Sequence, residues 1–167
     1  MAELVCKYIH ILSVQFGHFP NFLFISYFWG YLPMVYYYID FENVQLNGLK
    51  GIEELEKKDK ILIYCRETDI GRIKTALYGV NIKASVACRI VNSTSKNALD
   101  FELISDLFMS RSKCMKVIIS KDKGFDAAIQ KGLREGVLCF RSETMEKINV
   151  SDFWYYFKES GKEYVLR

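Results

Sequence analysis

From residue 36 to residue 44 the chain reads Tyr36-Tyr37-Tyr38-Ile39-Asp40-Phe41-Glu42-Asn43-Val44. The first half of this run does not alternate between apolar and charged side chains, which is typical of a strand buried on both faces in a parallel sheet. The run then ends in two carboxylates and an amide, on Asp40, Glu42 and Asn43. Ligands of open α/β sheets bind beyond the carboxyl ends of the strands, so we expect these three side chains at a functional edge.

The rest of the chain continues as alternating strand-like and helix-like stretches. Strands are predicted at residues 35–41, 60–65, 84–91, 116–120 and 137–140, and helices at 46–58, 70–78, 96–109 and 125–133. This alternation predicts an α/β fold built from βαβ units, with right-handed crossovers and a mostly parallel five-stranded sheet covered by helices on both faces. Ser93, Thr94 and Ser95 are candidate caps of the third helix, and Gly136 is expected to end the fourth.

The composition fits one domain with a sizeable core, because half of the 167 residues are hydrophobic. The formal net charge of +3 does not by itself indicate a nucleic-acid partner. The five cysteines are odd in number and lack metal-ligand spacing, which argues against a disulfide framework or a zinc site. Cys65, Cys88 and Cys139 lie in apolar runs, so we interpret them as reduced core residues and expect a cytoplasmic protein.

Residues 1–33 differ in composition from the remainder of the chain, since no Asp, Glu, Lys or Arg occurs between Ile11 and Ile39. A membrane anchor is one interpretation, but Pro20, Gly30 and Pro33 leave the apolar run shorter than the roughly 20 residues of a spanning helix. A signal peptide would need a stronger basic region and a cleavage site. We favour a third interpretation, that translation naturally starts at Met34, and expect no stable membrane insertion. The mass of the native protein tests this choice.

The remaining chain divides into a domain at 34–142 and a tail at 143–167 that carries one more predicted helix, around 152–158. Phe153, Trp154 and Phe157 would lie on one side of that helix. We expect them to pack on the core, and the alternatives are a homodimer contact or a platform for stacking bases.

Further acids fall at comparable places along the domain. Asp100 shares a helical face with Leu103, Ile104 and Leu107, so it is an acid on an apolar stripe near a helix N-terminus. Glu102 and Asp106 fall on a different face and are expected to be solvated. A strand that ends near Ser120 is followed by the last two acids, Asp122 and Asp126.

Taken alone, each of these acids has a structural explanation, because it could cap a helix or compensate a helix dipole. If the first and fourth strands are neighbours in the sheet, however, Asp40, Asp100, Asp122 and Asp126 converge on one edge. Clustered carboxylates repel one another unless a cation neutralises them. Oxygen ligands without His or Cys favour Mg²⁺ or Mn²⁺.

Three motifs carry a resemblance to a known family: Asp40-Phe41-Glu42-Asn43-Val44, Asn97-Ala98-Leu99-Asp100, and Ser120-Lys121-Asp122-Lys123-Gly124-Phe125-Asp126. In this order and spacing, from about residue 35 to residue 142, they resemble the acidic motifs of PIN-like nucleases, in particular the NYN and bacterial PIN-like branch. The resemblance implies a Rossmann-like three-layer α/β/α sandwich. It also implies metal-dependent cleavage of RNA, usually single-stranded. Residues 1–33 depart from the family pattern, and no separate RNA-binding module is recognisable.

The resemblance assigns metal coordination and catalysis to the four aspartates. Asn43 matches the polar position after the first aspartate, Ser120 matches a small hydroxyl residue near the site, and Glu42 is a further candidate for a substrate or supporting contact. Lys96, Lys121 and Lys123 are candidates for contacts with flanking phosphates, DNA being a further possible substrate. The alternative function is a PIN-like module that binds RNA or protein without cutting. A metal-dependent phosphatase or a receiver domain fits less well, because their acids belong at other positions.

Overall fold

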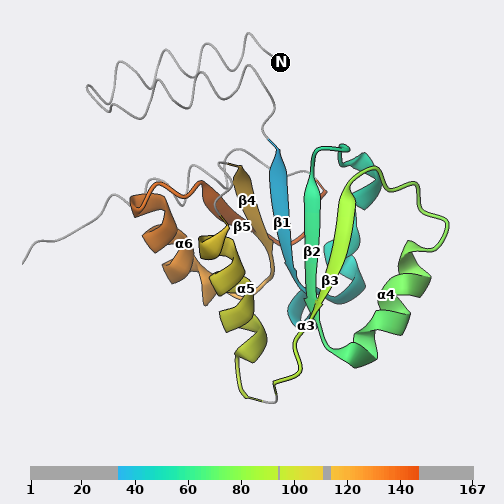
Figure 1. Ribbon diagram of the computed structural model, residues 1–167, viewed down its shortest axis with the longest axis horizontal. Helices are drawn as coiled ribbons and strands as arrows, with labels where there is room; N and C mark the ends of the chain where they lie inside the picture. Colours follow the sequence, from blue (N-terminus) through green and yellow to red (C-terminus); the bar gives the residue numbers. More distant parts are fainter. Residues whose placement is uncertain (1–33, 94, 111–113, 147–167) are drawn as a thin grey trace, which may run out of the picture. The chain divides into compact units, whose positions relative to one another are not determined.

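The structure, a computed structural model, describes residues 34–93, 95–110 and 114–146. The predictions for residues 1–33 and for the aromatic tail helix lie outside these residues. Five strands form one sheet in the order β3-β2-β1-β4-β5, and every neighbouring pair is parallel (Figure 1). The strands are β1 Val35–Asp40, β2 Lys60–Cys65, β3 Ser85–Ile90, β4 Met115–Ile119 and β5 Cys139–Ser142. The predicted α/β class and the five predicted strands are thus confirmed.

β1 is the central strand, and it pairs with β2 on one side and β4 on the other. The order of strands along the chain reverses at this point, because β1 continues to β2 whereas its other neighbour comes 80 residues later. The prediction that the first and fourth strands are adjacent in the sheet is therefore confirmed. In open sheets a ligand crevice forms beyond such a reversal.

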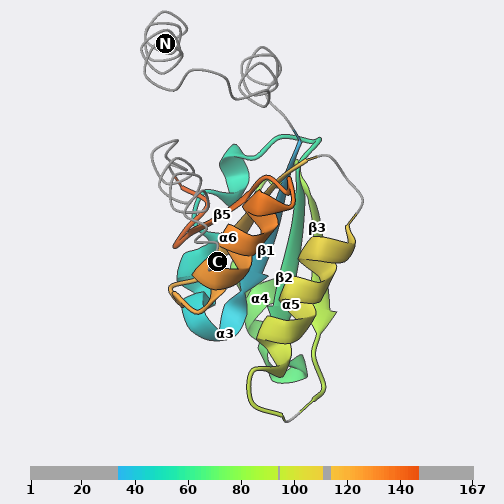
Figure 2. The same ribbon diagram turned by 90° about the vertical axis from the view of Figure 1, so that its left-hand side faces the viewer.

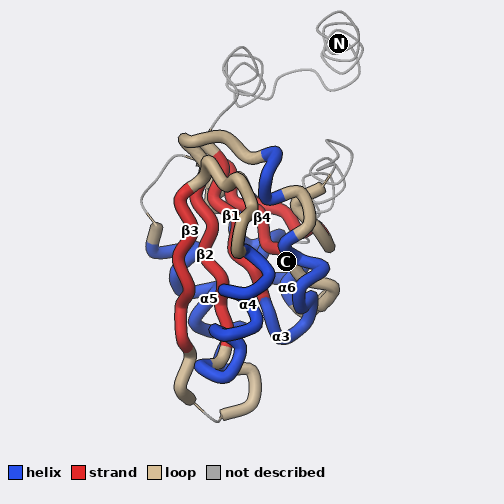
Figure 3. Tube along the Cα trace, turned by 90° about the vertical axis from the view of Figure 1, so that its right-hand side faces the viewer, coloured by secondary structure: helices blue, strands red, loops and turns tan. Residues whose placement is uncertain are grey.

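Helices lie on both faces of the sheet. α5 Ala98–Met109 contacts β1 and β2, α6 Phe125–Arg134 contacts β5, and the two helices contact each other. Viewed edge-on, α3 Phe41–Val44 lies on one side of β1 and α5 lies on the other (Figure 2). α4 Ile70–Leu77 lies on the α3 side, and β3 is the outer strand (Figure 3). Right-handed crossovers explain this division, since the chain moves in opposite directions across the sheet before and after β3.

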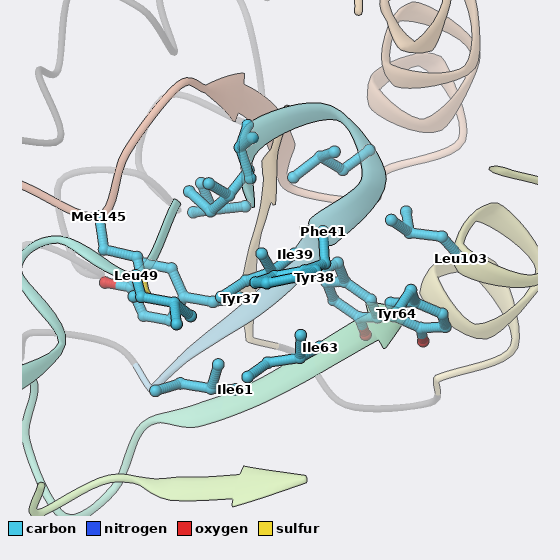
Figure 4. Packing of buried hydrophobic residues seen from close by; sticks show 14 of the residues in the cluster. Tyr37, Tyr38, Ile39, Phe41, Leu49, Ile61, Ile63, Tyr64, Leu103 and Met145 are labelled. Atoms are coloured by element: carbon cyan, nitrogen blue, oxygen red, sulfur yellow. The ribbon is translucent and has the colours of Figure 1, made fainter. Parts of the chain in front are cut away.

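The side chains of β1 alternate between the two faces (Figure 4). Tyr38 stacks against Tyr64 of β2, with ring centroids 6.4 Å apart, and both lie beside Leu103 of α5. Tyr37 points to the other face, beside Leu49 and Met145. Asp40 is two residues beyond Tyr38, so it shares the face that α5 covers.

The predicted helix at 46–58 is wrong. The segment instead forms two short 3-10 helices, η1 Gln45–Leu49 and η2 Ile52–Glu54. Gln45 and Gly51 have φ values of 53° and 88°, and this left-handed backbone interrupts a continuous helix. Its apolar residues Leu49, Ile52 and Leu55 are nevertheless buried, so the apolar spacing identified core residues while misjudging the backbone.

The ends of the later helices are partly as predicted. α5 begins after Asn97, which has a left-handed φ of 61° and makes no side-chain cap bond. The predicted caps Ser93 and Ser95 are therefore wrong, and the third candidate, Thr94, lies outside the described residues. At its other end the buried Lys116 of β4 donates from Nζ to the carbonyl oxygens of Leu107 at 2.6 Å and Ser110 at 2.9 Å. Gly136, with φ of 78°, follows α6 as predicted.

Two predictions about burial also fail. Cys65 and Cys139 are buried and reduced as expected, but Cys88 is exposed because it lies on the outer strand β3. Asp106 is not merely solvated, since its Oδ2 accepts a 2.7 Å hydrogen bond from the hydroxyl of Tyr64. No helix within the described ranges is long and apolar enough to span a membrane.

Candidate active site

Asp40 ends the central strand and is almost fully buried, with 3% of its surface exposed. Its Oδ2 accepts a 2.8 Å hydrogen bond from the Ser120 hydroxyl at the end of β4. Its Oδ1 accepts a 3.3 Å hydrogen bond from the backbone N–H of Asn43, which makes Asp40 the N-cap of α3. One carboxylate oxygen is thus oriented by the end of β4 and the other by the first turn of α3.

The pKa of Asp40 is raised from 3.8 to about 6, chiefly because the carboxyl is buried. The negative charges of Asp100 and Glu42 contribute to this rise, and the hydrogen bonds from Ser120 and Asn43 oppose it. Desolvation favours the neutral carboxyl, and the two hydrogen bonds favour the carboxylate. Asp40 is therefore an acid whose ionised form costs free energy in the absence of a neutralising charge.

Asp100 and Asp122 come from other elements and face the same region. Asp100 lies in the first turn of α5 and is half-buried, and its pKa is raised by burial and then by the charges of Asp122 and Glu42. Asp122 is exposed in the turn after β4, where its backbone N–H donates to the Ser120 hydroxyl oxygen at 3.0 Å. Carboxylates at the ends of β1 and β4 and at the start of α5 therefore lie within electrostatic reach of one another.

The polar residues after β1 connect this region to its surroundings. The side-chain oxygen of Asn43 accepts a 3.0 Å hydrogen bond from the backbone N–H of Lys121. Glu42 forms an ion pair with Nε of Arg66, the residue after β2. The same guanidinium donates to the carbonyl oxygen of Val91 at 3.2 Å. Glu42 is consequently held by a cation rather than directed only toward the aspartates.

Asp126 has a different environment from the other three aspartates. Its Oδ1 accepts a 2.9 Å hydrogen bond from Nε of Arg141 in β5, and this contact is also an ion pair. Asp126 is half-buried in the first turn of α6. At least one of its oxygens therefore faces a guanidinium.

The three candidate lysines, Lys96, Lys121 and Lys123, are all exposed. Lys121 and Lys123 flank Asp122 in the turn after β4, and Lys96 precedes α5. They lie in the loops that carry the acids, where exposed ammonium groups remain available to a polyanion.

The donors suit a hard divalent cation, because all are carboxylate oxygens and two of the acids have pKa values raised by burial and by neighbouring negative charge. Among the residues that the structure describes, no group of three His, Cys, Asp or Glu side chains is close enough to hold a metal ion. Mg²⁺ usually binds through one or two carboxylates and completes its shell with water and substrate phosphate. The arrangement fits that partial mode of coordination rather than an all-protein cage.

A model of the PIN domain family matches residues 34–142, which include all five strands and all four aspartates. The chain belongs to the PIN domain family. PIN domains are generally nucleases that use divalent metal ions and bind nucleic acids. No curated protein and no solved structure matches this chain. The narrower NYN assignment stays a prediction.

Two arginines of this PIN domain, Arg66 and Arg141, lie near the site although the sequence motifs do not include them. Each follows or lies in a strand of the sheet and pairs with an acid near the site. Both arginines follow the ends of predicted strands, and this position could have marked them as candidates for the functional edge. Which acid each arginine pairs with depends on tertiary structure.

Asp40→Asn is expected to stabilise this PIN domain above pH 6 when no metal is present. The unfolded carboxyl ionises near pH 4 and the folded one near 6, so ionisation of Asp40 destabilises the fold as pH rises through this window. The difference between 3.8 and about 6 corresponds to roughly 3 kcal/mol at most, which asparagine would recover. Denaturant unfolding in EDTA from pH 4 to pH 8 measures this gain, which should vanish near pH 4. A variant less stable than the wild type at every pH would contradict it.

Proposed function

We propose that the chain is a metal-dependent ribonuclease that hydrolyses phosphodiester bonds, with single-stranded RNA as its preferred substrate. The observation that carries this proposal is the buried Asp40 beside Ser120, electrostatically coupled to Asp100. A structural role alone does not explain a carboxylate buried next to other acids, because its ionisation costs stability. Membership of the PIN domain family supports a nuclease in general terms.

In the proposed site Asp40, Asp100 and Asp122 would bind Mg²⁺ or Mn²⁺ together, one or two of them as direct ligands and the remainder through bound water. An ion held there would supply charge stabilisation for the scissile phosphate and would favour a water nucleophile. Ser120 keeps Asp40 in place by its 2.8 Å hydrogen bond, and Asn43 fixes the turn after β4 through the N–H of Lys121.

The chain's own cations would receive the substrate. The exposed Lys121 and Lys123 flank Asp122, so the phosphates on either side of the scissile bond can meet ammonium groups at the metal site. Lys96 offers a third such group ahead of α5. Binding of RNA through these contacts should weaken as salt concentration rises.

Labelled single-stranded RNA should be cut by the full chain in Mn²⁺ or Mg²⁺ and left intact in excess EDTA. The same incubation with single-stranded DNA measures the preference between the two nucleic acids, and a 5′ or 3′ label separates internal from terminal cleavage. Full activity in excess EDTA would contradict a metal-dependent mechanism. Binding that does not change with salt would contradict a phosphate-directed substrate site.

A non-catalytic module that binds RNA or protein is the second candidate function. It is favoured by the lack, among the described residues, of a preassembled group of three metal-binding side chains. Titration calorimetry with Mn²⁺ distinguishes the two functions in the absence of substrate. Heat of binding that is lost in Asp40→Asn supports the nuclease, whereas no binding by the wild-type chain supports the module.

A further inference from the structure

Arg141 of β5 connects the last strand of the sheet to the end of β4. Its side chain is only 11% exposed, and its Nη1 donates a 2.9 Å hydrogen bond to the carbonyl oxygen of Ser120. Its Nε donates to Oδ1 of Asp126, also at 2.9 Å. Arginine has a planar fork of donors and stays charged at all relevant pH values, so it can hold these two acceptors in a fixed relation.

Ser120 is the residue through which Arg141 reaches the proposed metal site. It is completely buried, and its hydroxyl donates to Asp40 while accepting from the N–H of Asp122. Its own N–H donates to the carbonyl oxygen of Ser142 at 2.9 Å. Ser120 thus touches two of the proposed metal ligands, and Arg141 fixes its carbonyl group.

We propose that Arg141 is a positioning residue of the metal site and that Asp126 acts as its partner rather than as a fourth metal ligand. This inference rests on the proposed function. Asp126 orients the guanidinium so that Nη1 donates to the carbonyl oxygen of Ser120, and the Ser120 hydroxyl in turn orients the carboxylate of Asp40. Residues that orient metal ligands in this way are required for metal affinity although they never touch the ion.

The competing role of Asp126 as a direct ligand predicts the opposite effect of removing the arginine. Arg141→Ala removes a positive charge near the acids and takes the guanidinium away from Asp126, so a direct ligand would bind cations more tightly after the change. If Arg141 instead positions Ser120, the same variant leaves the Ser120 hydroxyl less well oriented toward Asp40 and binds cations less tightly. The sign of the change in Mn²⁺ affinity therefore decides between the two roles.

The experiment compares Mn²⁺ affinity by titration calorimetry in the full chain and in four variants: Arg141→Ala, Arg141→Lys, Asp126→Asn and Arg134→Ala. Arg134 is the matched control, because it is an exposed arginine of α6 and its loss changes the net charge equally. We expect about tenfold weaker binding in Arg141→Ala and in Asp126→Asn, and none of this loss in Arg134→Ala. The variant that carries both Arg141→Ala and Asp126→Asn should bind about as weakly as either change alone, since both act through one contact.

Arg141→Lys keeps the charge but has a single ammonium group in place of the fork, so it should recover only part of the affinity. This variant and Asp126→Asn keep the test valid if Arg141→Ala does not fold, as thermal unfolding in EDTA will show. Tighter Mn²⁺ binding in Arg141→Ala would overturn the inference. The inference would also be overturned if both Arg141 variants bound Mn²⁺ with wild-type affinity while Asp126→Asn lost Mn²⁺ binding completely.

A measurement without metal separates failure of this inference from failure of the proposed function. The Asp122 amide donates to the Ser120 hydroxyl, so its hydrogen exchange in EDTA should be faster in Arg141→Ala than in Arg134→Ala. Equal exchange rates would overturn the positioning role of Arg141. A wild-type chain that neither binds Mn²⁺ nor cuts RNA would overturn the proposed function, while the exchange rates still decide whether Arg141 holds Ser120.

Discussion

Asp40→Asn is expected to cleave RNA at least about 100-fold more slowly than the wild-type chain. The asparagine is isosteric and can still accept a hydrogen bond from Ser120, but it removes the buried negative charge proposed to hold the metal ion. A bound ion contributes several kcal/mol to the transition state of phosphodiester hydrolysis, and each 1.4 kcal/mol is about tenfold in rate. Initial rates at saturating Mn²⁺ with a labelled single-stranded RNA measure the effect.

Asp100→Asn should cause a comparable loss, because Asp100 faces the same region from α5. Glu102→Gln is the matched control for charge, since Glu102 is exposed on the same helix. We expect Glu102→Gln to retain wild-type activity. If both aspartate variants kept most of their activity, the acids would not form the catalytic centre, and the nuclease proposal would fail.

The largest expected effect on stability is that of Gly51→Ala. Gly51 has φ of 88°, and a Cβ there would lie 2.7 Å from the backbone nitrogen of Glu146. The left-handed backbone costs a residue with a side chain about 1 kcal/mol, and displacing a packed backbone segment adds a further 1 to 3 kcal/mol or so. We expect a loss of about 3 kcal/mol in the free energy of unfolding, measured by denaturant titration.

Gly79→Ala is the control that separates these two costs. Gly79 has a similar φ of 76°, but no atom lies within 4 Å of the position that its Cβ would take. We therefore expect this variant to lose only about 1 kcal/mol, the cost of the backbone conformation. Equal losses in the two variants would show that the close approach of Glu146 to Gly51 is unimportant.

The strands and the first acidic edge could be predicted from the sequence because these features are local. An apolar run such as Ile61–Tyr64 has no solvated face, and the acid after β1 directly follows such a run. The resemblance to PIN-like nucleases, now confirmed for the family, rested on three short motifs at strand and helix ends. The convergence of the acids needed one further step, the assumption that the first and fourth strands are neighbours.

The features that the sequence did not predict depend on contacts between distant segments. In place of the helix expected at 46–58 there are two 3-10 turns, and Gly51, which separates them with a positive φ, lies against the backbone of Glu146. Similarly, Asp122 and Asp126 belong to one short motif, but Asp122 is exposed whereas Asp126 is half-buried against Arg141 of the neighbouring strand β5. The periodicity of apolar residues predicts which side chains are buried, but it does not predict which cationic side chain pairs with a given acid.

The pairing of β1 with β4 also has a consequence for co-translational folding. Asp40 and its hydrogen-bond donor Ser120 are 80 residues apart in the chain. Synthesis proceeds from the N-terminus, so the central strand emerges long before β4 can be added beside it. Until then the carboxylate of Asp40 lacks the serine that orients it, and β1 lacks half of its pairing. A nascent chain therefore cannot assemble the acidic edge before β4 and Ser120 have left the exit tunnel, and the contact between Asp40 and Ser120 forms only when the domain is nearly complete.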